Sequence, residues 1–192
     1  MKHFVQKAQE KLSHPAVPFW LAGLGGLFYL IQGLIYAHTT VTSLDEGAYL
    51  LKGILFVRGV YEPFEPYGPL TNKAPFAFLI PGFAEYIFGA GLRTGRYFFL
   101  LIGLLNLLGV WMAVHRWANA WFAAGAVWVF ALSPMIIKLH VRAVSQVLIA
   151  CMLAWVCVFV VRKYSKPWQI IAGSLLAALA VMTRQNMAPI LV

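Results

Sequence analysis

The chain alternates long apolar runs without charge and short segments that carry its ionisable residues. No Lys, Arg, Asp or Glu lies between Lys11 and Asp45, and the later uncharged runs cover 97–115, 117–137, 143–161 and 167–183. A helix of roughly 20 apolar residues crosses the hydrocarbon of a bilayer, so each run is long enough, or nearly so. The pattern predicts an all-α, polytopic membrane protein with about five to six transmembrane helices.

The first apolar run predicts a retained membrane anchor over residues 16–37. It is too long and too late for a cleaved signal peptide, and no small-residue cleavage site follows it. We expect further spans at Tyr97–Val114, Trp117–Leu132, Val144–Val161 and Trp168–Met182, with another beginning near Met187. Residues 1–192 then form a single transmembrane domain, and an apolar run that reaches Val192 suggests truncation at the C-terminus.

The distribution of charge predicts which face each connection occupies. Lys2, Lys7 and Lys11 stand against one acid, Glu10, so the positive-inside rule places the N-terminus in the cytoplasm. The segment 41–96 then forms an outer loop, and it holds five of the six acids. If each later span crosses the membrane once, Arg116 and the basic cluster 162–166 lie on the cytoplasmic face. The segments 133–142 and 183–186 then lie outside.

The outer loop contains the pattern of a short helix at the membrane interface. Ser43-Leu44-Asp45-Glu46 fits a capping box, and Gly59 stands where a helix C-cap belongs, which predicts a helix over Leu44–Arg58. Asp45, Tyr49 and Lys52 fall on one polar stripe of this helix, and apolar residues cover the rest.

A second apolar stretch in the outer loop, Ala74–Leu92, is predicted not to cross the membrane. Pro81 lies in its middle and Glu85 near its end, and the uncharged part is too short for a bilayer. We therefore expect a second interfacial or re-entrant helix. This reading also keeps the basic cluster near Arg162 in the cytoplasm, as the positive-inside rule requires.

Composition narrows the classes of function. The chain is 61% hydrophobic and 11% charged, with a mean hydropathy of +0.77. A net charge of +9 would suggest nucleic acid for a soluble domain, but the basic residues are scattered through short connections and act as topology signals. The sequence has no Gly-rich phosphate loop, Cys-x-x-Cys pair or His spacing typical of metal sites. It therefore predicts a bilayer as partner, no nucleic acid and no metal centre.

The predicted topology gathers acids and cations on one face, where lipid headgroups lie. A carboxylate beside several cations can remove a proton from an attacking hydroxyl while the cations neutralise a departing phosphate. These residues are Asp45, Glu46, Tyr49, Lys52, Lys73, Lys138, His140, Arg142, Gln146 and Arg184.

The order of these motifs resembles a family of membrane enzymes. An Asp-Glu pair opens an outer helix after a first span, and three elements follow: Lys73-Ala74-Pro75, the segment 142–146 (Arg-Ala-Val-Ser-Gln) and the segment 183–186 (Thr-Arg-Gln-Asn). This layout looks like that of the GT-C glycosyltransferases of the protein-mannosyltransferase and aminoarabinose-transferase type. The resemblance implies an enzyme at the outer face of the inner membrane that moves a sugar from a polyprenyl-phosphate donor to a lipid, glycan or protein.

Residue roles follow from that resemblance. It implies that Asp45 is the catalytic base or the acid that orients the acceptor, and that Lys73 holds the donor phosphate; Glu46, beside Asp45, is the second candidate catalytic residue. Arg142 and Arg184, with Tyr49 and Gln146, would line the substrate pocket. Gln146 departs from the many relatives that carry an acid there, which argues against a metal bridged by two acids. No particular cofactor is identified, and whether a divalent cation assists stays open.

Several residues have a second interpretation. Glu46 at the third helical position could serve as a capping residue instead of a catalyst. Arg142 and Arg184 could anchor to native lipid phosphate, and Lys52 and Lys138 are best read as snorkelling and span-ending residues. For the whole chain, the alternatives to a transferase are a transporter or flippase of an anionic lipid, and a noncatalytic remnant or assembly subunit.

Overall fold

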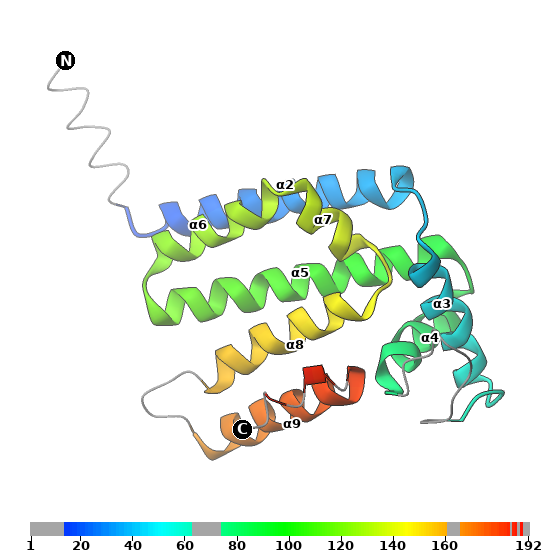
Figure 1. Ribbon diagram of the computed structural model, residues 1–192. Coiled ribbons are helices and arrows are strands. Elements are labelled where there is room, and N and C mark those ends of the chain that lie inside the picture. Colours follow the sequence, from blue (N-terminus) through cyan, green and yellow to red (C-terminus); the bar gives the residue numbers. More distant parts are fainter. Residues whose placement is uncertain (1–13, 63–73, 161–165, 185, 188, 190–192) are drawn as a thin grey trace, which may run out of the picture.

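The computed structural model describes residues 14–62, 74–160, 166–184, 186–187 and 189. Every regular element within these ranges that is longer than a turn is an α-helix (Figure 1). The helices are α2 (Val17–Thr39), α3 (Leu44–Val57), α4 (Phe76–Phe88), α5 (Leu92–Trp117), α6 (Ala120–Ala131), α7 (Pro134–Val141), α8 (Ser145–Val160) and α9 (Pro167–Thr183).

Two of these helices are long and apolar enough to cross a membrane, namely α2 and α5. A third span results if α6 and α7 count as one, although their axes are bent by 75°. The helices α4, α8 and α9 are apolar but shorter than a full span. The all-α, membrane-type architecture is thus confirmed, and the larger number of spans stays a prediction.

The long helices lie side by side: α2, α6 and α9 run toward the end that holds α3 and α4, and α5 and α8 run away from it (Figure 1). α5 packs between the pair α2 and α6 on one side and α8 on the other, and α9 packs against α8. The short helices α3 and α4 pack on each other at one end of this array. We call this end the α3–α4 rim. It also holds the C-terminal ends of α2 and α9, the start of α5 and the α7–α8 turn (Figure 1).

The opposite rim holds the start of α2, the α5–α6 turn and the start of α9 (Figure 1). There the Arg116 guanidinium donates a hydrogen bond to the Val158 carbonyl, which ties α5 to α8. Of the segments predicted to share a face, α3, α4, the α7–α8 turn and the end of α9 lie at one end of the bundle, whereas α7 begins nearer its middle (Figure 1). Ala74–Leu92, which we predicted not to cross, forms α4 and the turn into α5 at the α3–α4 rim.

The interior of the bundle is apolar and depends on glycine at two helix crossings. Tyr29, Leu100 and Val141 belong to one buried cluster between α2, α5 and α7. Leu100 packs onto Gly33 of α2, where a larger side chain would collide with it. Gly53 of α3 faces the backbone of α4, and a Cβ there would lie 2.6 Å from the Phe78 carbonyl oxygen and 2.8 Å from the amide nitrogen of the α4 residue Gly82.

Three sequence predictions about helix boundaries need correction. α5 begins at Leu92, five residues before the predicted Tyr97, because the charge of Arg96 is neutralised inside the protein. The segment 133–142 was expected to be a connection, but Pro134 opens the helix α7 there. The capping box is half present: Ser43 Oγ accepts from the Glu46 amide at 3.3 Å, but the Glu46 side chain turns to Arg96 instead of the cap.

Other boundaries agree closely with the sequence. Arg58 caps α3, and Gly59 follows it with φ of 72°, a conformation that glycine adopts at little cost. The predicted spans near α8 and α9 lie within two residues of the observed helices. The span expected to begin near Met187 falls mostly outside the described residues.

The backbone contact between α3 and α4 gives a first prediction. Gly53→Ala places a methyl group against the α4 backbone and should destabilise the protein by about 1–3 kcal/mol, the usual cost of overpacking. Thermal unfolding in detergent measures the effect. Gly47→Ala on the same helix is the matched control, because a Cβ there meets nothing within 4 Å. It should be neutral or slightly stabilising, and an equal loss in both variants would contradict the close contact.

Candidate functional site

The α3–α4 rim is built around a buried ion pair between Glu46 and Arg96. The Arg96 Nε and Nη2 atoms donate to the two carboxylate oxygens of Glu46, each at 2.9 Å. Glu46 is 0% exposed and Arg96 is 2% exposed. Paired in this two-point geometry, the charges satisfy each other away from water, where either alone would be costly.

The same two side chains hold four segments together. Arg96 Nη1 donates to the carbonyls of Ala37 at 3.0 Å and Thr40 at 2.8 Å, which fixes the end of α2. The Ala143 amide donates to Glu46 Oε1 at 3.4 Å, which brings the α7–α8 turn to the same carboxylate. The pair therefore joins α2, α3, α5 and the α7–α8 turn, although these segments are far apart in sequence.

Asp45 precedes Glu46 in the first turn of α3, and its side chain is exposed at the rim. Ser43 caps this turn, and the aligned amides at a helix N-terminus favour a negative charge there. The two acids thus differ sharply in environment. Glu46 is enclosed with its partner, while Asp45 is free to meet a molecule that approaches the rim.

The segment 142–146 lies against α3. The hydroxyls of Tyr49 and Ser145 are 3.0 Å apart, and Ser145 is fully buried. Arg142 is partly buried, and its Nε atom has no hydrogen-bond partner among the described residues. Gln146 is exposed at the start of α8. Glu46 and Tyr49 therefore meet the segment that carries Arg142 and Gln146, as the sequence predicted for one face.

For two predicted site residues, Arg184 and Lys73, the structure gives only an approximate position or none. Arg184 caps the C-terminus of α9 and is partly exposed. It lies at the α3–α4 rim through the packing of α9 near α4 (Figure 1). Lys73 lies outside the described residues, so the structure says nothing of its predicted role. Within the described ranges, no three His, Cys, Asp or Glu side chains gather as metal ligands would.

Glu85 is a further buried acid at this rim, and its role is local. Its Oε1 atom accepts a hydrogen bond from the Gly91 amide at 3.1 Å, across the turn from α4 to α5. Burial raises the pKa of this carboxyl group, and the hydrogen bond from Gly91 opposes that rise. Glu85 therefore holds the turn that positions Arg96 at the start of α5.

A second polar cluster lies deeper, where α7 turns away from α6. The Tyr29 hydroxyl and His140 Nδ1 are 2.7 Å apart and buried. Gln32 Nε2 donates to the Ala131 carbonyl at 2.8 Å, beside the end of α6. The ammonium group of Lys138 lies 5.0 Å from the ring centre of Tyr36. Lys138, predicted simply to end a span, packs on α2, and His140 belongs to the interior.

Arg96 is the residue at this rim that the sequence reasoning missed. It borders an uncharged run and was read as the boundary of a span, which is the usual place for arginine. One signal could have indicated this pairing. Glu46 and Arg96 lie near the two ends of the same predicted outer loop, and an arginine that becomes buried requires an acid as its partner. The choice among five acids could not be made from spacing alone.

The ion pair gives a second prediction. Glu46→Gln leaves the buried guanidinium without its counter-charge and should destabilise the protein by about 3–5 kcal/mol. Asp45→Asn, its exposed neighbour in the same turn, should change stability by about 0.5 kcal/mol or less. Thermal unfolding of both variants in detergent makes the comparison. Similar stability for the two would mean that the pair does not hold the rim.

Comparison of the chain with protein-family models, with curated proteins and with solved structures finds no significant match. The functional assignment therefore depends on the residues and geometry of the rim itself.

Proposed function

We propose that the chain is a membrane glycosyltransferase that moves a sugar from a polyprenyl-phosphate donor to an acceptor hydroxyl on the outer face of the inner membrane. The observation that supports this most is the meeting of the first turn of α3 with the α7–α8 turn. The Ala143 amide, 3.4 Å from the Glu46 carboxylate, places Arg142 beside the turn that presents Asp45. A base and a phosphate-binding cation then border one rim.

In this proposal the Asp45 carboxylate takes the proton of the acceptor hydroxyl. The acceptor oxygen attacks the anomeric carbon of the donor sugar as the bond from that carbon to the phosphate oxygen breaks. The lipid phosphate leaves as a stable anion, so no dedicated general acid is needed. The transfer is a single displacement that inverts the anomeric centre.

Arg142 is suited to hold the departing phosphate. Its guanidinium offers a planar set of donors, and the buried Nε atom has no partner among the residues described. The Nε atom itself is covered by protein, so a phosphate oxygen would bind the remaining nitrogens of this partly exposed guanidinium. Arg184, at the same rim, and Lys73 are assigned to the donor as well, by the resemblance of their motifs. Glu46 is assigned to structure, because its two oxygens already bind Arg96.

A third prediction tests the proposed base. Asp45→Asn should lower transfer from a radiolabelled polyprenyl-phosphate sugar by about 10²- to 10⁴-fold, the usual contribution of a general base. The assay uses membranes that contain the chain, with its amount fixed by immunoblot. Arg58→Gln, exposed at the other end of α3, serves as the matched control and should keep full activity. Transfer that persists in Asp45→Asn at the control level would refute the role.

A fourth prediction tests the phosphate contact. Arg142→Gln should lower the same transfer by about 10²- to 10³-fold, because charge on the leaving phosphate is no longer neutralised. Its thermal unfolding should stay close to that of the unchanged protein, since the side chain has no hydrogen-bond or ion-pair partner to lose among the described residues. Loss of stability without loss of transfer would assign Arg142 to structure.

One observation favours a second candidate, a transporter or flippase of an anionic lipid. Transporter sites are commonly built at interrupted helices inside the membrane, and the break between α6 and α7 lies beside the buried Tyr29 and His140. Reconstituted vesicles with a fluorescent anionic lipid separate the two functions. A transporter accelerates the movement of that lipid between leaflets, and a transferase leaves it at the rate of empty vesicles.

A further inference from the structure

The opposite rim carries positive charge without the acids that accompany it at the α3–α4 rim. Arg116, next to the last residue of α5, and Lys166, which directly precedes α9, are both exposed there. The acids within the described ranges belong instead to α3, to α4 and to the residues just after α3, and they are Asp45, Glu46, Glu62 and Glu85. Among the described residues, the opposite rim therefore has cations and no acid.

Four exposed tryptophans lie at the same rim. Trp20 is near the start of α2, Trp117 ends α5, and Trp121 and Trp168 lie in the first turns of α6 and α9. Their exposed fractions run from 46% for Trp121 to 82% for Trp117. Tryptophan favours the headgroup depth of a bilayer, where the ring has apolar surroundings and the N–H meets water. This end of the bundle therefore has the composition of a membrane–water boundary.

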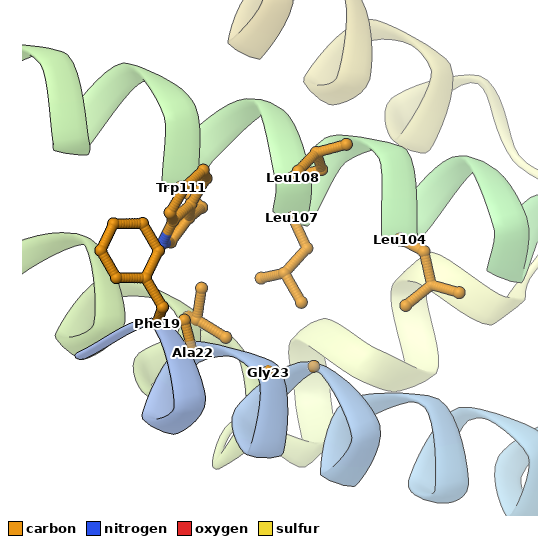
Figure 2. Close-up of a pocket in the computed structure, with 9 residues that line it drawn as sticks. Phe19, Ala22, Gly23, Leu104, Leu107, Leu108 and Trp111 are labelled. Atoms are coloured by element: carbon orange, nitrogen blue, oxygen red, sulfur yellow. The ribbon is translucent and has the colours of Figure 1, made fainter. Parts of the chain in front are cut away.

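The surroundings become apolar a short way in from this rim. Figure 2 shows Phe19 of α2 and Trp111 of α5 facing each other, and their ring centres are 5.7 Å apart. Beyond them, a cavity of about 300 Å³ is lined by apolar and aromatic side chains and glycine. Arg116 follows Trp111 by five residues, which is roughly 7.5 Å along a helix. The Arg116 guanidinium thus lies just outside the apolar layer, at the depth that lipid phosphates occupy.

Arg116 and Lys166 border one continuous surface across the ends of α5, α8 and α9. The Arg116 guanidinium donates to the Val158 carbonyl near the end of α8. The ring of Phe159, the next residue of α8, lies 5.8 Å from the ring of Trp168 in the first turn of α9. Lys166 precedes that tryptophan by two residues. The end of α8 therefore joins the two cations into a single surface.

We infer that this surface, formed by Arg116, Trp117, Lys166 and Trp168, binds the headgroup of an anionic phospholipid. The Val158 carbonyl occupies one guanidinium nitrogen, so the exposed Arg116 retains donors for phosphate oxygens. Lys166 adds a second positive charge, and the tryptophans lie against the glycerol and ester region of the lipid. A headgroup with net negative charge is favoured, because the surface offers no acid to the cation of a zwitterionic headgroup. The inference does not depend on the proposed transferase activity, which uses the other rim.

The experiment measures binding of phosphatidylglycerol to the purified chain in detergent, by energy transfer from its tryptophans to a dansyl group on the lipid tail. Phosphatidylcholine with the same labelled tail is the reference lipid. The unchanged protein should bind phosphatidylglycerol about 20-fold more tightly, since each cation near an anionic lipid contributes about fivefold. Raising sodium chloride to about 0.5 M should remove most of this preference. Equal affinity for the two lipids at low salt would overturn the proposal.

Substitutions locate the preference. Arg116→Gln and Lys166→Gln should each lower it about fivefold, and Arg116→Lys, which keeps the charge, should retain most of it. Lys166→Gln leaves the local backbone contact in place, because the amide of this residue donates to the Gln169 side chain at 3.0 Å. Arg58→Gln, exposed at the end of α3 on the other rim, is the matched control and should change nothing. A preference that persists in both Arg116→Gln and Lys166→Gln, or that falls equally in Arg58→Gln, would place the lipid elsewhere and refute the assignment.

A last arm separates a lipid headgroup from a free anion. Unlabelled phosphatidylglycerol should displace the labelled lipid from the unchanged protein. Inorganic phosphate in modest excess should not, because it lacks the glycerol and ester groups that the tryptophans contact. Displacement by inorganic phosphate would show a site for a soluble anion, and the assignment to a lipid would then be wrong.

Discussion

The arrangement of the α3–α4 rim depends on one buried ion pair, Arg96 with Glu46. A charge enclosed in a protein is tolerated only with a partner and with its remaining donors satisfied. Arg96 meets both conditions by also binding the carbonyls of Ala37 and Thr40, and Glu46 does so by accepting from Ala143. The positions of Asp45, Tyr49 and Arg142 follow from this pair, because it sets where α3 and the α7–α8 turn lie.

This constraint separates the two neighbouring acids of α3. The Glu46 side chain points inward and binds Arg96, and the side chain of Asp45, the residue before it, is exposed. Successive residues on a helix project about 100° apart, so an adjacent pair can divide in this way without any change in backbone. The proposed chemistry uses this division: the enclosed pair fixes the position of the turn, and Asp45 with Arg142 remains available to a donor and an acceptor.

Local features of the sequence predicted much of the fold. Uncharged apolar runs identified α2, α5, α8 and α9, and Ser43 and Gly59 marked the ends of α3, because these signals depend on residues a few positions apart. Arg96 was misread because its partner is fifty residues away and only the folded chain brings them together. The bend at Pro134 was missed for a related reason. The hydropathy of an apolar run identifies a helix, but it does not show where the helix axis changes direction.

The close approach of Gly53 and Gly82 has a consequence for how relatives of this chain could be recognised. Backbone in contact with backbone leaves no room for a side chain at either position, whatever the surrounding sequence. Membrane helices exchange their apolar residues readily, so overall similarity fades early among distant descendants. Two glycines on successive short helices, with an acid before the first and an arginine after the second, would outlast it as a sparse signature of common ancestry.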